Sequence, residues 1–177
     1  MSVNCVPTFT DSVKNVPILS KIVAAVSTNN EIFVPKIKHE VITDQNIIKN
    51  TFPVKEEKPT IDLGDLKQVS TQAEKDAYNP DFPEYTTSTY RIMTVYKSPS
   101  GKELIITQGN SEDNADGPLP NIVNKTSTAK VKGVDAAICE AKNGYTQVVF
   151  IKNKKLYNIM GYKMSKAELI KIAESLQ

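Results

Sequence analysis

Apolar and polar residues alternate along the second half of the chain, which is typical of β-strands. From Tyr85 the period changes to two, so that one face of a strand carries Tyr90, Ile92, Thr94 and Tyr96, and the other face carries Met93 and Val95. Turn-forming residues at 98–101 lead to a partner strand at 104–107. Further strands are predicted at 129–132, 134–141, 145–151 and 156–160, with tight turns at Asn143-Gly144 and Asn153-Lys154. The pattern predicts an antiparallel, meander-like sheet over about residues 85–160.

The last residues of the chain predict an amphipathic helix. Ser165 and Glu168 have the spacing of a capping box, and Met164 and Leu169 that of a hydrophobic staple. The apolar face that follows consists of Leu169, Ile170, Ile172, Ala173 and Leu176. We expect this face to cover the sheet. A shorter helix is predicted over 70–77, with Thr71 as its cap.

Residues 6–27 predict helices that are interrupted at Pro17. Their apolar stripe consists of Phe9, Val13, Ile18, Leu19, Ile22 and Val26. We expect this stripe to pack on the sheet or across a dimer, and a partner-binding or membrane-proximal helix is the alternative. The predicted fold is therefore α+β, with a C-terminal helix and N-terminal helices packed on an antiparallel sheet. Residues 1–60 form an N-terminal helical and extended segment in this prediction, and residues 61–177 form the α+β domain.

Composition changes this picture little, but it argues against a nucleic-acid partner and against a membrane-spanning segment. The 177 residues include 22 basic and 20 acidic ones, giving a formal net charge of +2. Only Arg91 is an arginine, whereas proteins that read nucleic acids favour arginine for its bidentate fork. No nucleic-acid partner is expected. The longest apolar-leaning run, at 16–26, is too short to span a membrane.

Motifs for catalysis or metal binding are missing from the sequence. Cys5, His39 and Cys139 are far apart and share no zinc-binding pattern. The sequence contains no G-x-S-x-G, no P-loop and no G-x-G-x-x-G. We therefore expect no catalytic residue, no cofactor and no metal, and a protein that is not an enzyme. The two cysteines are not expected to form a disulfide.

The segment at 109–128 is the candidate contact loop, because long loops between strands often carry function. Its candidate residues are Glu112, Asp113, Asn114 and Asp116. Glu112, Asn114 and Asp116 have the spacing of the first ligands of a calcium-binding loop, but Val123 stands where the closing acidic ligand should be. An irregular calcium site and a solvated acidic loop are the alternatives.

The C-terminal sequence resembles a bacterial family, the domain of unknown function 4367. The resemblance is carried by GYTQVVF at 144–150, KLYNIMG at 155–161 and MSKAELIKIAESL at 164–176. The family pattern has leucine where Met164 stands and glutamate where Ala167 stands. The resemblance covers about residues 69–177 and brings no catalytic motif.

A second resemblance lies at the N-terminus, in VNCVPTFTDSV at 3–13 and VPILSKIV at 16–23. These runs are similar to the juxtamembrane segment of transmembrane anti-sigma-factor-like proteins from Firmicutes. The resemblance implies a membrane anchor N-terminal to this sequence and a location on the cell-surface side of a Gram-positive membrane. It implies an extracytoplasmic, non-enzymatic domain for sensing or signalling. The expected partner is an unknown protein or peptide, and the apolar stripe at 6–27 also allows a homodimer. The alternative is a binding module for an apolar or peptide ligand, in a cavity between sheet and helices.

Overall fold

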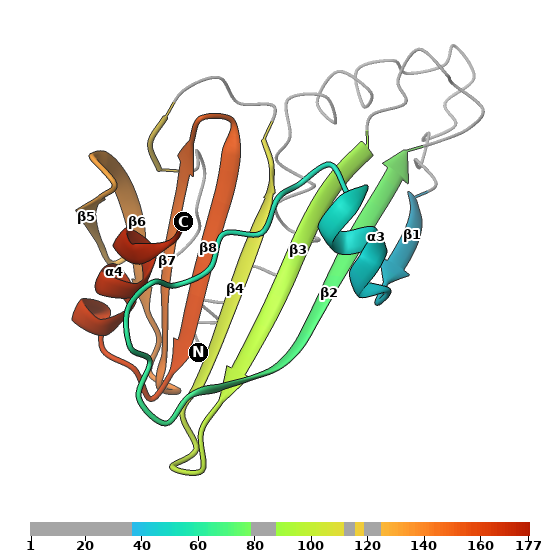
Figure 1. Ribbon diagram of the computed structural model, residues 1–177. Coiled ribbons are helices and arrows are strands. Elements are labelled where there is room, and N and C mark those ends of the chain that lie inside the picture. The colour runs from blue at the N-terminus through green and yellow to red at the C-terminus, as the bar shows by residue number, and fades with distance from the viewer. Residues whose placement is uncertain (1–36, 79–87, 112–115, 119–124) are drawn as a thin grey trace, which may run out of the picture.

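The computed structural model describes residues 37–78, 88–111, 116–118 and 125–177 (Figure 1). These residues form one eight-stranded antiparallel sheet and two short helices. The elements in chain order are β1 (Ile37–Ile42), α3 (Gln45–Asn50), β2 (Lys67–Tyr78), β3 (Ser88–Lys97), β4 (Glu103–Asn110), β5 (Ser127–Val131), β6 (Val134–Glu140), β7 (Tyr145–Lys152), β8 (Lys155–Tyr162) and α4 (Lys166–Ser175).

The strand order of the sheet is β1-β2-β3-β4-β8-β7-β6-β5. Every pair is antiparallel, and the order departs from a meander after β4. The chain leaves β4 for the far edge of the sheet, and three successive hairpins then return it so that β8 pairs with β4. The two halves of the sheet are therefore joined by the β4–β8 ladder.

The hairpins of the second half follow from residues that tolerate a left-handed backbone. The φ angles of Lys132 and Gly133 are 51° and 82°, and those of Asn153 and Lys154 are 52° and 60°. Two successive positive φ values match the right-handed twist of the flanking strands. Gly144, at φ 87°, serves the turn between β6 and β7. The turns predicted at Asn143-Gly144 and Asn153-Lys154 are confirmed.

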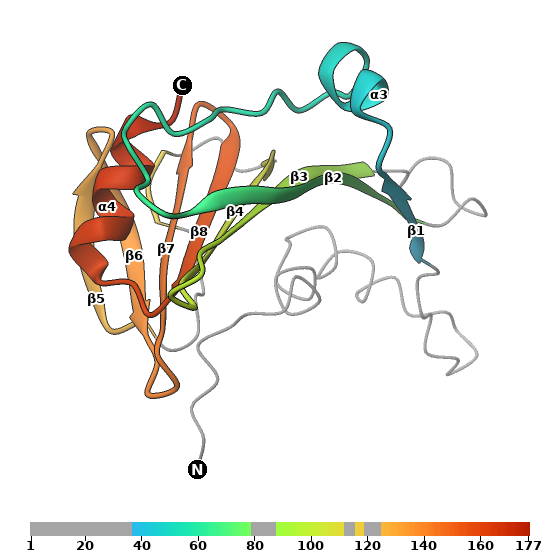
Figure 2. The same ribbon diagram turned by 60° about the horizontal axis from the view of Figure 1, so that its bottom comes forward.

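One face of the sheet carries most of the core. Figure 2 shows that α3, α4 and the chain between α3 and β2 all lie on this side. We call residues 52–66, which run across this face, the crossing segment. The core residues are Leu66, Tyr96, Leu104, Ile106, Val131, Ala136, Ile138, Val148, Phe150, Tyr157, Ile159, Met164, Leu169, Ile172, Ala173 and Leu176. A smaller cluster beneath α3 consists of Ile48, Phe52, Val54, Ala73 and Ile92.

The C-terminal helix has the predicted start. The Ser165 hydroxyl accepts from the Glu168 N–H, and the Glu168 carboxylate accepts from the Ser165 N–H, which makes a reciprocal capping box. Met164 and Leu169 are both buried in the core. The Leu169, Ile172, Ala173 and Leu176 side chains are buried as expected, because they form the apolar face of this helix.

The predicted fold class is wrong. The described residues form mainly an eight-stranded antiparallel sheet, and their only helices are α3 and α4. The N-terminal helices predicted over residues 6–27 are not seen, and that stretch lies outside the described residues. The sheet is also larger than predicted, because β1 and β2 extend it beyond residue 85 toward the N-terminus.

The helix predicted over 70–77 is also wrong, since these residues belong to β2. This strand pairs with β1 on one side and with β3 on the other. Thr71 and Ala73 are buried under the crossing segment and α3, whereas Glu74 points to the other face and pairs with Arg91. A helix cap contributes only about 1 kcal/mol. Two ladders of backbone hydrogen bonds and the buried face outweigh it.

No helix in the described part of the chain is long and apolar enough to cross a membrane.

Candidate functional site

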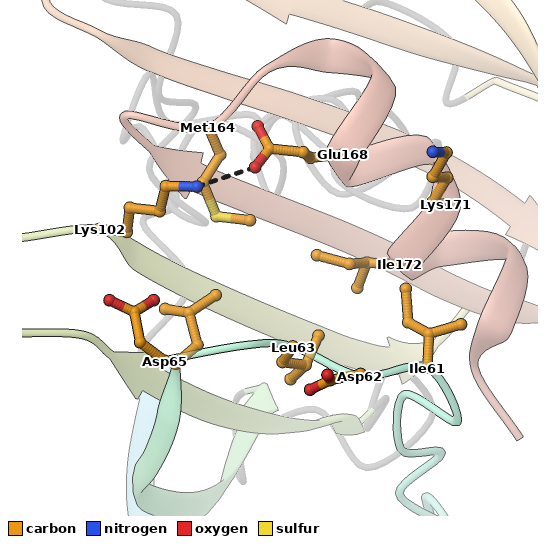
Figure 3. A pocket seen from close by; sticks show the side chains of 10 residues that line it. Ile61, Asp62, Leu63, Asp65, Lys102, Met164, Glu168, Lys171 and Ile172 are labelled. Carbon is orange, nitrogen blue, oxygen red and sulfur yellow. Dashed lines mark hydrogen bonds and ion pairs between the residues drawn. The ribbon is translucent and has the colours of Figure 1, made fainter. Parts of the chain in front are cut away.

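A shallow groove of about 170 Å³ lies between residues 61–66 and α4 (Figure 3). One wall is the last part of the crossing segment, and the other wall is α4 together with the turn between β3 and β4. The residues that line it are Ile61, Asp62, Leu63, Asp65, Leu66, Lys102, Met164, Glu168, Lys171 and Ile172. The groove combines an apolar floor with a charged rim.

Backbone pairing with the C-terminus fixes the crossing segment next to α4. The Lys58 N–H donates to the Gln177 carbonyl at 2.8 Å, and the Gln177 N–H donates to the Lys58 carbonyl at 3.1 Å. The Thr60 N–H and hydroxyl both donate to the Ser175 carbonyl, the hydroxyl at 2.8 Å. The crossing segment and the end of α4 therefore form a short antiparallel ladder, and the groove opens directly beyond it.

Gln108 of β4 connects the crossing segment to the sheet through two hydrogen bonds. Its side-chain Oε1 accepts from the Glu57 N–H at 2.9 Å, and its Nε2 donates to the Glu57 carbonyl at 2.7 Å. The amide thus satisfies both backbone groups of one residue, as a neighbouring strand would. Gln108 is only 1% exposed, so this contact is shielded from water.

The Glu57 carboxylate is the centre of a charged cluster. The Tyr157 hydroxyl donates to Oε1 at 2.7 Å, and Lys155 Nζ lies 3.0 Å from the same oxygen. Lys132 Nζ lies 3.6 Å from Oε2. Burial raises the pKa of Glu57, but the hydrogen bond from Tyr157 and the two lysines outweigh it, so the pKa is lowered. Burial and the bond to Glu57 raise the pKa of Tyr157.

These two shifts keep the carboxylate ionised and the phenol protonated. A general acid or base needs a pKa near the working pH, and here each pKa moves away from neutrality. The cluster therefore stabilises the crossing segment and is poorly suited to transferring protons.

The floor of the groove is part of the core. Leu66, Met164 and Ile172 are buried, and Leu63 is partly buried against the same cluster. Ile61 lies at the mouth with 41% of its surface exposed. An apolar side chain entering the groove would cover Ile61 and contact the edge of the core.

The rim carries three acidic and two basic side chains. Lys102 Nζ lies 2.9 Å from Glu168 Oε1. The Asp65 carboxylate accepts from the Ser100 hydroxyl at 3.0 Å, and the Asp62 carboxylate accepts from the Gly64 N–H at 2.8 Å. Lys171 makes no ion pair with any described residue. The charge of Glu168 is thus compensated within the chain. Asp62 and Asp65 accept hydrogen bonds from neutral groups, and Asp65 also interacts electrostatically with Lys102.

Replacing Glu168 by glutamine is expected to reduce the loss of stability in acid. The Ser165 N–H, then Lys102 and the Ser165 hydroxyl, lower the pKa of Glu168 to about 2. The Glu168 carboxylate makes its full contribution to the free energy of unfolding above its ordinary pKa of 4.5. This contribution disappears as the pH falls toward 2. The Glu168 side chain is 44% exposed, so solvent screens its charge, and we expect an effect of about 1 kcal/mol or less.

Urea denaturation at about pH 6 and about pH 2.5 measures this effect. The difference in unfolding free energy between the natural protein and the Glu168→Gln variant should shrink at the lower pH. Glu140→Gln is the matched control, since Glu140 is exposed at the end of β6. An equal acid response in all three proteins would contradict the prediction.

The described part of the predicted contact loop does not line the groove. Glu112, Asp113 and Asn114 lie outside the described residues. The Asp116 carboxylate accepts from the Asn153 N–H at 2.7 Å, in the turn between β7 and β8, and Gly117 pairs with Ile151. The contact role of this loop stays a prediction. The sequence does not reveal the groove wall at 61–66. The preceding residues 52–59 have a composition that is typical of a linker, and Asp62-Leu63-Gly64-Asp65 has one that is typical of an ordinary turn.

The residues considered for metal or cysteine chemistry also have positions in the fold. His39 Nδ1 lies 2.7 Å from Asp76 Oδ1, joining β1 to β2, and Arg91 pairs with Asp76 and Glu74. No group of three or more potential metal ligands occurs among the described residues. Cys139 is buried in β6, and Cys5 lies outside the described part, so the disulfide prediction is untested.

The comparison with known families identifies the C-terminal part of the chain. Residues 76–176 match the model of a domain of unknown function (DUF4367). The chain belongs to this family. The match contains β3 to β8 and α4, so it includes the helical wall of the groove but not residues 61–66. No curated protein and no solved structure matches the chain. The anti-sigma-factor-like segment predicted near the N-terminus lies outside the matched residues.

Proposed function

We propose that this DUF4367 protein is the non-enzymatic, extracytoplasmic binding domain of a membrane-anchored bacterial regulator. The groove between residues 61–66 and α4 is the observation that carries the proposal. It places exposed Ile61 and a charged rim over the edge of the core, which suits reversible recognition. It lies between the crossing segment and α4, not between the sheet and a helix.

The titration of the central cluster supports a role without catalysis. Glu57 and Tyr157 are held in the protonation states that they have in water at neutral pH. Their hydrogen bonds are used to hold the crossing segment on the sheet. In the described part of the chain, these groups therefore serve the shape of the groove.

The location outside the membrane rests on the resemblance of residues 3–23 to anti-sigma-factor-like juxtamembrane segments. In this proposal an N-terminal anchor holds the domain on the cell-surface side, and the bound partner is a protein or peptide. The crossing segment offers a physical route for a signal, because it runs from the groove to α3, next to the edge strand β1.

Labelling of intact cells tests the location. A Lys142→Cys variant of the full-length protein presents a thiol in the exposed turn between β6 and β7. A membrane-impermeant maleimide is expected to modify this variant in whole bacteria. The unsubstituted protein is the control for Cys5, since Cys139 is only 1% exposed. Modification of the introduced thiol only after lysis would overturn the proposed location.

A further inference from the structure

We infer that the groove binds a protein segment in which a large aliphatic side chain stands beside a lysine or arginine. This inference rests on the proposed function and adds the chemistry of the partner. It follows from three properties of the groove: its size, the placement of its charges, and the fixed geometry of its walls.

The size of the groove fits a single side chain. Pockets for whole small molecules measure roughly 300–1,000 Å³. The groove measures about 170 Å³, and Leu63, Leu66, Met164 and Ile172 make its floor apolar. An aliphatic side chain that projects from a partner's backbone would fill it and cover Ile61. The backbone of that partner would then remain at the mouth, next to the charged rim.

The charges at the mouth favour a basic neighbour. Asp62 and Asp65 both belong to the crossing-segment wall, and Figure 3 shows Lys171 on the opposite wall, on α4. Glu168 already faces Lys102 at 2.9 Å. A cation on the partner would therefore meet Asp62, which has no ion pair with a described residue, and Asp65, which interacts with Lys102 only from beyond ion-pair distance. Such complementarity selects partners and accelerates their association.

The walls need little reordering when a partner binds. The ladder between Thr60 and Ser175 holds one wall, and the capping box and Lys102 hold the start of the other. The Asp62 carboxylate also fixes the turn at Gly64. Preorganised walls lower the entropic cost of binding, so a short peptide should be sufficient to detect recognition.

Three synthetic peptides, each acetylated and amidated, test the inference by their ability to shift amide signals in the NMR spectrum. The probe is Ser-Lys-Leu-Lys-Ser, the charge control replaces both lysines by glutamate, and the apolar control replaces the leucine by alanine. The probe should shift amide signals of residues 61–66 and 164–172, and should bind about tenfold more tightly than either control, which corresponds to about 1.4 kcal/mol.

Two surface variants locate the binding. Ile61→Ser should weaken binding of the probe about tenfold, because it removes the exposed apolar contact. Val69→Ser is the matched control, since Val69 is 55% exposed and does not line the groove, and it should bind as the natural protein does. The double variant Asp62→Asn, Asp65→Asn should lose most of the preference for lysine over glutamate. Thermal melting verifies that each variant is folded.

The results separate this inference from the proposed function. Equal binding of the lysine and glutamate peptides, signals that move elsewhere, or equal effects of Ile61→Ser and Val69→Ser would each overturn the ligand class. The maleimide result at Lys142→Cys would stand in any of these cases. Labelling only after lysis, combined with peptide binding in the groove, would overturn the location and leave the groove's chemistry intact.

Discussion

Replacing Gln108 by alanine is expected to lower the free energy of unfolding by about 3 kcal/mol. The side chain is buried, and its two hydrogen bonds satisfy the N–H and the carbonyl of Glu57. Each backbone group left without a partner in a shielded position costs about 1–3 kcal/mol, and the cavity adds to this. Urea denaturation followed by circular dichroism measures the change.

Gln68→Ala is the control for this prediction. Gln68 is exposed, and its Nε2 donates a single hydrogen bond to the Thr71 hydroxyl at 2.8 Å. The expected loss is about 1 kcal/mol or less. A similar loss in both variants would mean that Gln108 does not anchor the crossing segment.

The elements that sequence analysis predicted correctly are those with local causes. Gly144 in one turn, and Asn153 and Lys154 in another, supply the positive φ that a tight turn requires, whatever the rest of the chain does. Ser165 and Glu168 make a capping box from residues three positions apart. Each of these signals acts within a few residues, so its outcome can be predicted without knowledge of distant partners.

The elements that were mispredicted depend on distant partners. The 70–77 stretch has a helix cap, but pairing with β1 and β3 makes it a strand. The β4–β8 ladder joins residues such as Ile106 and Ile159, and no local pattern specifies that pairing. Sheet propensity depends on neighbouring strands more than on the residues themselves, which explains these errors.

The candidate groove was not predictable for a related reason. Glu56 and Glu57 stand between prolines and lysines, a composition typical of an exposed linker. In the fold, Glu57 meets Tyr157 and Lys155, which lie about one hundred residues further along the chain. The contacts that fix this stretch, and with it the wall at 61–66 that follows, are therefore absent from its own sequence, whereas the helical wall is visible as an amphipathic pattern.

Replacing Phe150 by alanine is expected to cause the largest loss of stability, about 3–5 kcal/mol. The ring is fully buried in β7 and stacks on Tyr157, with centroids 4.7 Å apart and an angle of 8° between planes. The substitution removes this contact and leaves a cavity beneath the crossing segment. Phe150→Leu retains most of the volume, so it should cost about 1.5 kcal/mol or less. Thermal and urea denaturation measure both losses.

Tyr145→Ala provides the control within the same strand. Tyr145 packs against Tyr162 with ring centroids 4.9 Å apart and a tilt of 39°, but both rings are partly exposed, so the loss of stability in Tyr145→Ala should be clearly smaller.

The Phe150 cavity should also loosen the Tyr157 ring, whose hydroxyl donates to the Glu57 carboxylate. In a double-mutant cycle, Tyr157→Phe should therefore cost less in the Phe150→Ala background than in the natural protein, by about 0.5 kcal/mol or more. Strict additivity would show that the stacked pair does not support the Glu57 contact, and that the crossing segment depends on Gln108 and its ladder with the C-terminus.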